Sequence, residues 1–311
     1  MNSKENIKDN SQGSSPVISI IIPFYGEKDD LFGCLKGLKK QNFHSLFEII
    51  VVESGIDNGI EQLTDKVKNI VLISSHSLLY PGKARNLGVK NSKTDLLAFI
   101  DADCIPVSTW LYEVYSSLKN GDEMVIGPVI NLYPFHPIAS VDNLIQFADF
   151  QKHRTSENVD HFPGCNLGIK KEIFIKSGGF PEEINIGEDS KLSETLIKRY
   201  EARISFNQRM VVKHSGRKKI FSFLKHHVSF GYYRGYSKQG ISSVQNRFRS
   251  SLLYSVLFGL RRLIIICIRT LQWNQVGIAR IIFYFPFLIL GLSAWVFGFW
   301  KGNQEVLKGK S

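Results

Sequence analysis

The stretch Leu96-Leu97-Ala98-Phe99-Ile100-Asp101-Ala102-Asp103-Cys104 decides the fold, because five apolar residues run directly into two carboxylates. An apolar run this short, preceded by the polar residues 91–95, predicts a strand buried on both faces of a parallel sheet. In open α/β sheets, ligands bind beyond the carboxyl ends of the strands, where Asp101 and Asp103 are expected to lie. Two carboxylates spaced in this way suit a hard divalent cation that also binds a substrate phosphate. Taken alone, the same residues also fit a strand followed by an acidic turn.

Strand and helix signals alternate before this stretch. Apolar or β-branched runs predict strands at residues 17–22, 47–52 and 70–73. The helices between them are predicted from apolar spacing at Leu31, Cys34/Leu35 and Leu38, from Ile60, Leu63 and Val67, and from the run 81–88, with Asp29 or Asp30 capping the first. Short joints imply right-handed βαβ units, hence a mostly parallel sheet with helices on both faces. Neither a Gly-x-Gly-x-x-Gly run nor a Walker loop follows the first strand, so a phosphate-bearing ligand needs a metal here.

Weaker signals follow downstream. Residues 108–119 and 140–152 are predicted helices, and residues 124–130 and 211–214 are predicted strands. Residues 162–169 are glycine-rich and then strand-like. Gly178-Gly179 predicts a tight turn, because adjacent glycines permit positive φ. Gly187-Glu188-Asp189 opens a further helix, and acids in a first helical turn are favoured by the helix dipole whatever their function.

Charge divides the chain into two parts. Residues 201–311 hold 18 Lys and Arg against two acids, whereas residues 1–200 hold 21 Lys and Arg against 26 acids. A basic segment that also contains long apolar runs points to an anionic membrane surface rather than to nucleic acid. The four cysteines are scattered, which favours a reducing compartment over a disulfide framework. Residues 1–15 are polar and have no apolar core, so a disordered leader is expected there.

The order of these signals resembles that of a family 2 glycosyltransferase of the GT-A fold, membrane-associated and of bacterial type, over roughly residues 17–215. The resemblance is carried by Pro23, Glu53 and Asp57, the run 82–88, Asp101-Ala102-Asp103 as a DXD motif, Gly178-Gly179-Phe180, Gly187-Glu188-Asp189 and His214. It implies an inverting enzyme that transfers a sugar from a nucleoside diphosphate to a hydroxyl group. Such an enzyme requires that the charge growing on the departing diphosphate be stabilised.

The resemblance also implies roles for individual residues. Asp103, Asp101 and His214 would hold Mn²⁺ or Mg²⁺. The donor would be bound by Pro23, Tyr25, Glu27, Glu53, Asp57, Lys83, Arg85 and Asp101, with Glu53 accepting hydrogen bonds from the base, although the family usually has Asp there. For Arg85, a surface position on a helix is an equal alternative. His214 is equally compatible with a structural role.

Asp189 matches the catalytic base of the family, and Glu188 would orient the acceptor or support the loop. The acceptor side would include Gly164, Asn166, Gly178 and Gly179. The sequence departs from the family pattern at Thr195 and at Tyr200-Glu201. It also lacks the Gln-x-x-Arg-Trp signature of processive synthases, so transfer of one sugar per encounter is expected.

The C-terminal part contains three apolar segments. Residues 281–300 form an uncharged run long enough to cross a bilayer as a helix. In residues 252–268, Arg261-Arg262 argue against a plain span and for an interfacial helix or a hairpin with arginines facing protein. Residues 221–236 are aromatic and basic, and fit either a membrane surface or the catalytic module, with Arg234 as a weaker candidate for a diphosphate contact.

These segments set the predicted organisation. We expect a leader at residues 1–15, a catalytic domain at 16–219, an amphipathic membrane-proximal segment at 220–250 and membrane-associated helices at 251–311. The protein would sit on the inner membrane with its catalytic domain in the cytoplasm, act on a lipid-linked or cell-envelope acceptor in polysaccharide biosynthesis, and bind no nucleic acid. The alternatives are a nucleotidyltransferase acting on a sugar phosphate and a non-catalytic membrane-bound nucleotide-sugar binder.

Overall fold

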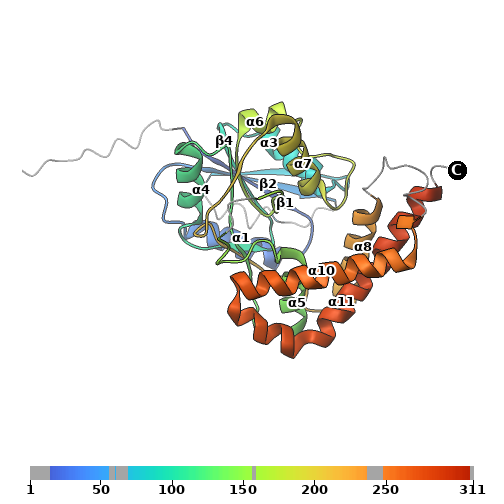
Figure 1. Ribbon diagram of the computed structural model, residues 1–311. Coiled ribbons are helices and arrows are strands. Elements are labelled where there is room, and N and C mark those ends of the chain that lie inside the picture. Colours follow the sequence, from blue (N-terminus) through green and yellow to red (C-terminus); the bar gives the residue numbers. More distant parts are fainter. Residues whose placement is uncertain (1–14, 56–59, 61–68, 156–158, 237–247, 309–311) are drawn as a thin grey trace, which may run out of the picture.

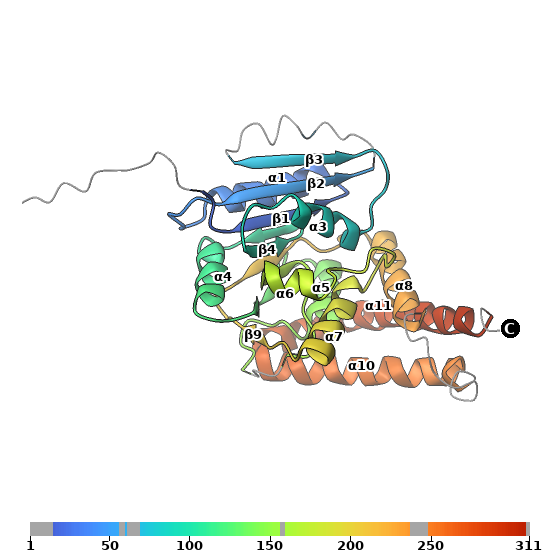
Figure 2. The ribbon, with the colours of Figure 1, turned by 90° about the horizontal axis from the view of Figure 1, so that it is seen from above.

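A computed structural model describes residues 15–55, 60, 69–155, 159–236 and 248–308 (Figure 1). A sheet layered between helices forms one part of the molecule, and the C-terminal helices pack together beside it. Seen from above, the first strands lie side by side, and the two longest C-terminal helices run alongside each other (Figure 2).

The central sheet has seven strands and is mostly parallel. Its order is β3 (Ile70–Ser75), β2 (Glu48–Ser54), β1 (Ser19–Phe24), β4 (Leu96–Ile100), β8 (Asn166–Lys170), β6 (Met124–Ile126) and β9 (Ile204–Phe206). Neighbours pair in parallel except for β8, which runs antiparallel to both β4 and β6. The predicted α/β class is therefore confirmed. The antiparallel direction of β8 was not predicted.

Helices cover both faces of this sheet. Alternate residues of β2 therefore pack against helices on opposite faces. Ile49 and Val51 join the main core with α1 (Lys28–Lys39), whereas Ile50 and Val52 pack with Ala84 of α3 (Pro81–Lys90). Every residue of β4 is buried, as its apolar run predicts. The helices α4 (Trp110–Lys119), α6 (Lys171–Lys176) and α7 (Glu188–Tyr200) complete the layers.

A second, three-stranded sheet determines where His214 lies. Its order is β5 (Cys104–Pro106), β10 (Val212–His214) and β7 (Val129–Asn131). In the antiparallel pairing of β10 with β5, His214 lies opposite Cys104, directly after Asp103. The polypeptide thus brings together two residues that are far apart in sequence.

The structure corrects several predicted elements. The single strand expected at 124–130 is divided between the two sheets, because Pro128 lacks an N–H group and Gly127 approaches the Met210 carbonyl too closely for any side chain. Asp29 and Asp30 do not cap α1: its N-cap is Glu27, whose side chain makes no cap hydrogen bond. The helix expected at Ile60, Leu63 and Val67 falls mainly outside the described residues. The strand β9 was not predicted.

The C-terminal part is built from α8 (Ile220–Tyr236), α10 (Leu252–Trp273) and α11 (Gln275–Lys308). These helices share an apolar cluster with α5 (Pro137–Phe147), which belongs to the predicted catalytic domain. Packing therefore continues across the predicted boundary at residue 219. Inside α11 the backbone departs from helical geometry at Tyr284, as expected close to Pro286.

Glycines on two facing helices let α8 and α11 approach to backbone contact. A Cβ atom at Gly231 would collide with the Trp295 carbonyl, and one at Gly298 would collide with the Val228 carbonyl. The same reciprocal arrangement recurs one turn further on, at Gly235 and Gly302. Small residues spaced four apart on both partners are typical of closely crossing helices in membranes.

The outer faces of α10 and α11 are apolar. Exposed large side chains on α10 are Leu252, Leu253, Val256, Leu257, Leu260, Ile264, Ile268 and Leu271. Those on α11 are Ile282, Phe283, Phe285, Ile289, Leu290 and Phe297. Arg262 points inward instead, donating to the Ile145 carbonyl at 2.8 Å and lying 4.8 Å from the centre of the Trp295 ring. Among the described residues, one helix, Gly277–Val306, is long and apolar enough to cross a membrane, which is weak support for a span.

Candidate active site

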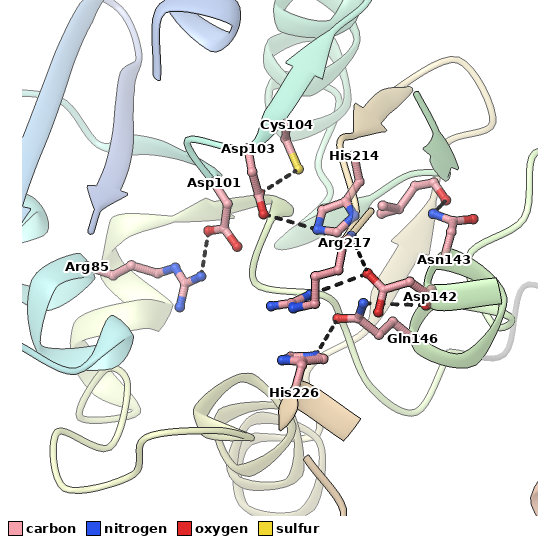
Figure 3. A network of polar contacts seen from close by, with 11 residues as sticks. Arg85, Asp101, Asp103, Cys104, Asp142, Asn143, Gln146, His214, Arg217 and His226 are labelled. Carbon is pink, nitrogen blue, oxygen red and sulfur yellow. Dashed lines mark hydrogen bonds and ion pairs between the residues drawn. The ribbon is translucent and has the colours of Figure 1, made fainter. Parts of the chain in front are cut away.

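The carboxylates that follow β4 each have a cationic or imidazole partner (Figure 3). Asp101 Oδ1 lies 2.7 Å from Arg85 Nη2, and Asp103 Oδ2 lies 3.2 Å from His214 Nε2. Both acids lie at the carboxyl end of the central strand, where ligands bind in open α/β sheets. The prediction that Asp101 and Asp103 lie at the carboxyl end of this strand is thus confirmed.

Arg85 joins two parts of this site. Its Nη1 lies 2.6 Å from Glu188 Oε1, so one guanidinium bridges Asp101 and Glu188. The arginine is only 3% exposed, which excludes a surface position on α3. Gly164 packs directly against the guanidinium, since a Cβ atom there would lie 3.0 Å from Nη2. Arg85 is therefore a buried residue of the site that forms an ion pair with an acid on each side.

The acids at the start of α7 differ in accessibility. Glu188 is buried against Arg85, whereas Asp189 is partly exposed. The Asp189 carboxylate accepts hydrogen bonds from the backbone N–H groups of Ser190 at 2.6 Å and Gly164 at 3.2 Å. Gly187 adopts φ 97°, a left-handed conformation that suits glycine, and so turns the chain into the helix. The two backbone hydrogen bonds fix the direction of Asp189.

Burial and the neighbouring Asp189 raise the pKa of Glu188 to about 7, although Arg85 acts in the opposite sense. At Asp103, burial raises the pKa, but His214, Arg217 and the Cys104 thiol together outweigh burial and lower the pKa to about 2. Burial lowers the pKa of His214, but the charge and hydrogen bond of Asp103 raise it, and the net shift of the pKa is upward. The site therefore contains one carboxyl group that titrates near neutrality and one firmly ionised carboxylate.

The donor set can be tested for a divalent cation. Asp103 and His214 offer a carboxylate oxygen and an imidazole nitrogen 3.2 Å apart, and both are ligand types that Mn²⁺ accepts. No cluster of three or more His, Cys, Asp or Glu side chains able to hold a metal occurs within the described ranges. Asp101 is engaged by Arg85, so its role as a ligand stays a prediction. Two protein ligands fit an ion that takes its other ligands from substrate and water.

The predicted base-binding region is only partly described. Glu53 is 2% exposed and accepts a hydrogen bond from Ser74 Oγ at 2.9 Å, across the pairing of β2 with β3. Tyr25 is 71% exposed, and its ring packs on Gly55. Pro23 lies within β1, and Glu27 and Lys83 are exposed on the surface. Asp57 lies outside the described residues. The donor-binding roles of these side chains stay predictions.

The predicted acceptor side needs one correction. Asn166 is fully buried, where its amide donates to the carbonyls of Pro128 and Met210 and accepts from the indole of Trp110. These bonds join the two sheets and give Asn166 a structural role instead of contact with an acceptor. Gly178 and Gly179 have positive φ, as the predicted turn requires. This turn places Phe180 under the Arg85 guanidinium, 5.2 Å from the ring centre.

Sequence reasoning missed several polar residues around the site. Burial, and after it the nearby charge of Asp103, raises the pKa of Asp30. Arg217 follows β10 and faces the same opening, and Asp142 of α5 holds it from behind (Figure 3). The basic run Arg217-Lys218-Lys219, which begins three residues after His214, was the available signal. No sequence feature pointed to Asp142.

The fold and the paired acids at the end of β4 define an α/β protein of the GT-A class. The chain aligns with the mannosyltransferase PcManGT of Pyrobaculum calidifontis, solved in complex with GDP-Man and Mn²⁺, at a TM-score of 0.61. That alignment covers 94% of this chain and 88% of the other, at 14% identity, and so speaks for the fold alone.

A family model then gives the particular assignment. The model for glycosyl transferase family 2 matches residues 19–178, about half of the sequence, and the chain belongs to this family. It is 27% identical over 180 residues to the glycosyltransferase AglE of Haloferax volcanii, covering 56% of this chain and 59% of the relative. It is 32% identical over 148 residues to polypeptide N-acetylgalactosaminyltransferase 3 of Drosophila melanogaster, covering 44% of this chain and 21% of the relative. The chain thus matches about three fifths of the first relative and about a fifth of the second.

Proposed function

We propose that the protein is an inverting glycosyltransferase that moves a sugar from a nucleoside diphosphate to a hydroxyl group of a lipid-linked or cell-envelope acceptor. The observation that carries this proposal is the line of contacts from Asp101 through Arg85 to Glu188, with Asp189 as its neighbour. This line supports a common site for the acid pair of β4 and the acids of α7. Membership in family 2 and the solved relative with GDP-Man and Mn²⁺ support a nucleotide-sugar donor.

Each acid takes a separate task in this proposal. Asp103 and His214 would hold Mn²⁺ or Mg²⁺, which supplies positive charge to the departing diphosphate. Asp189, partly exposed and held by two backbone N–H groups, accepts the proton of the acceptor hydroxyl as that oxygen attacks the sugar carbon. A base on the side away from the leaving group gives inversion. Glu188 is buried and keeps Arg85 in place instead of meeting the acceptor.

The location of the acceptor is argued from the C-terminal helices. Their outward apolar faces and the candidate span support association with a membrane, and the free cysteines within the described part suit a cytoplasmic catalytic domain. We therefore place the reaction at the inner membrane, with one sugar transferred per encounter. This placement gives the enzyme access to an acceptor anchored in the bilayer.

The decisive experiment measures release of nucleoside diphosphate from a panel of nucleotide sugars with Mn²⁺ or Mg²⁺, using the full chain and a membrane extract as acceptor source. Asp103→Ala is expected to abolish donor turnover, because the diphosphate loses its cation site. Asp189→Ala is expected to retain donor binding and to lose at least about a hundredfold in transfer, the usual effect of removing a general base. Glu194→Ala, an exposed acid on the same helix, serves as the matched control and is expected to match wild type.

Other outcomes of this experiment identify the alternatives. Pyrophosphate release from a nucleoside triphosphate and a sugar phosphate would indicate a nucleotidyltransferase. Tight nucleotide-sugar binding without turnover would indicate a non-catalytic binder. Full transfer by Asp189→Ala would assign the base to another residue.

A further inference from the structure

The positively charged side chains of the site differ in how many of their hydrogen-bond donors already contact carboxylates. Arg85 has both terminal nitrogens on carboxylates, Asp101 on one side and Glu188 on the other, and it is almost fully buried. A diphosphate in front of β4 meets the carboxylates of Asp101 and Asp103, which repel it. Beyond a metal ion, such a ligand therefore needs a cation whose hydrogen-bond donors still face the opening.

Arg217 meets this requirement. It lies in the turn after β10 and directly follows Gly216, which has φ 61°. Its side chain is 30% exposed, and among the described residues its guanidinium has one ion-pair partner, Asp142 Oδ2, 3.4 Å from Nη1. In Figure 3 the guanidinium extends into the space between Asp103 and His226, facing Arg85 across the opening. An arginine has five N–H donors, so one partner leaves most of its fork available.

Asp142 holds Arg217 from a fully buried position on α5. Its Oδ2 accepts the backbone N–H of Arg217 at 2.9 Å, and its Oδ1 lies 3.0 Å from His227 Nε2. Asp142 and His227 are both 0% exposed. One carboxylate thus fixes the main chain and the side chain of Arg217 and ties them to α8. A buried, fully engaged carboxylate of this kind restricts the arginine to a narrow range of positions.

We propose that Arg217 binds the diphosphate of the donor opposite Arg85, and that Asp142 and His227 are positioning residues that hold Arg217 in place. This inference rests on the proposed function, because it presumes a nucleoside diphosphate in the site. It makes α8, which crosses α11 at Gly231 and Gly298, part of the donor site. The arginine stabilises the leaving group by charge and hydrogen bonds, and takes no part in proton transfer.

The test is equilibrium binding of UDP and of GDP, each with Mn²⁺, to the full chain in detergent, with the parent nucleosides as a second ligand set. Arg217→Gln is the main variant, since it removes the charge but retains a donor for Asp142. It is expected to weaken diphosphate binding about tenfold or more, as loss of a hydrogen bond to a charged group implies, and to leave nucleoside binding unchanged. Arg217→Lys should recover part of the loss. Arg209→Ala, a surface arginine paired with Glu113, is the matched control and should bind as wild type.

A double-mutant cycle separates positioning by Asp142 from a general structural effect. Asp142→Asn is expected to weaken diphosphate binding in the wild-type background and to have no further effect in the Arg217→Gln background, because it acts through the arginine. His227→Gln should behave in the same way with a smaller effect. Equal losses in both backgrounds would show that Asp142 supports only the fold.

The outcomes also separate this inference from the proposed function. Failure of both diphosphates to bind the wild-type protein would overturn the proposed function and the inference together. Wild-type affinity of Arg217→Gln for the diphosphate would overturn the inference and leave the proposed function intact. Parallel losses for diphosphate and nucleoside would likewise overturn it, since the arginine would then not act on the phosphates.

Discussion

The sheet domain and the C-terminal helices arrange polarity in opposite ways. In the sheet domain the strands are apolar and buried, with Ile20, Ile21 and Ile22 fully enclosed. In the C-terminal helices, Arg262 points inward to a backbone carbonyl and an aromatic ring, while leucines and isoleucines of α10 face outward. Polar side chains that face inward and apolar side chains that face outward are expected when the surroundings are lipid instead of water. The two regions therefore distribute polar and apolar side chains differently, and the candidate site lies close to the contact between Asp142 of α5 and His227 of α8.

The largest expected effect comes from the glycines between α8 and α11. Gly298→Ala places a methyl group where the Val228 carbonyl lies, and is expected to destabilise the protein by about 3 kcal/mol, the upper part of the range for overpacking. Gly33→Ala in α1 is the matched change in the sheet domain. Its Cβ would lie 3.4 Å from Ile105 Cδ1, an ordinary contact, so helix propensity should make it neutral or stabilising by up to about 1 kcal/mol.

Thermal unfolding of both variants in detergent tests this difference. If Gly298→Ala unfolds at the wild-type temperature, the close crossing of the two helices does not exist in solution.

A second prediction concerns the outer face of α10. Leu257→Lys with Ile264→Lys is expected to reduce partitioning of the protein into membranes at least about tenfold, since each side chain contributes 1.5 to 3 kcal/mol, roughly, when fully buried in an apolar phase. Phe32→Lys with Leu46→Lys alters two similarly exposed apolar residues of the sheet domain and should leave partitioning unchanged. The measurement is the fraction of protein retained in washed membranes. Equal retention of both double variants would contradict a lipid-facing α10.

The smallest expected effect is on the pH dependence of stability. Burial lowers the pKa of His226 well below its ordinary 6.5, and it also lowers that of His227. The unfolded chain therefore binds more protons than the folded one below pH 6.5, so stability is present above that pH and is lost as the pH falls. Asp142, Arg217 and His214 act on these rings, and His226 also contacts Gln146 at 3.2 Å.

His226→Gln should therefore flatten the fall in unfolding temperature between about pH 7 and pH 5, where the wild-type chain charges a buried imidazole. His44→Gln, in an exposed loop, should retain the wild-type slope. The raised pKa of Glu188 acts in the opposite sense, but it is common to all three proteins and cancels in the comparison. An unchanged slope in His226→Gln would place the proton uptake elsewhere.

Much of the sheet domain could be predicted because its signals are local. The apolar run of β4, the acids after it and the glycine turn at 178–179 each follow from a few adjacent residues. The antiparallel direction of β8 and the division at Gly127-Pro128 depend on which strand each segment meets, and no local signal encodes that.

The candidate site shows the same limit. The family resemblance implied that His214 is a metal ligand together with Asp103. The pairing of β10 with β5 brings the two side chains together, and the ligand role itself stays a prediction. Arg217 and Asp142 were not identified, because their contact joins segments that are distant in sequence. The aromatic and basic composition of residues 221–236 pointed to Arg234 instead, which is exposed on α8. The four-residue spacing of Gly231 with Gly235, and of Gly298 with Gly302, predicts a close helix crossing only when the two helices are known to face each other.

The crossing of α8 over α11 also affects how the protein should be handled in the laboratory. A fragment ending at residue 219 would lack His227, and Asp142 would lose its hydrogen-bond contact with that side chain. Under the proposals made above, trimming the chain for solubility is therefore expected to change nucleotide affinity as well as membrane attachment. The detergent or lipid that surrounds α11 then becomes an experimental variable in every donor-binding measurement.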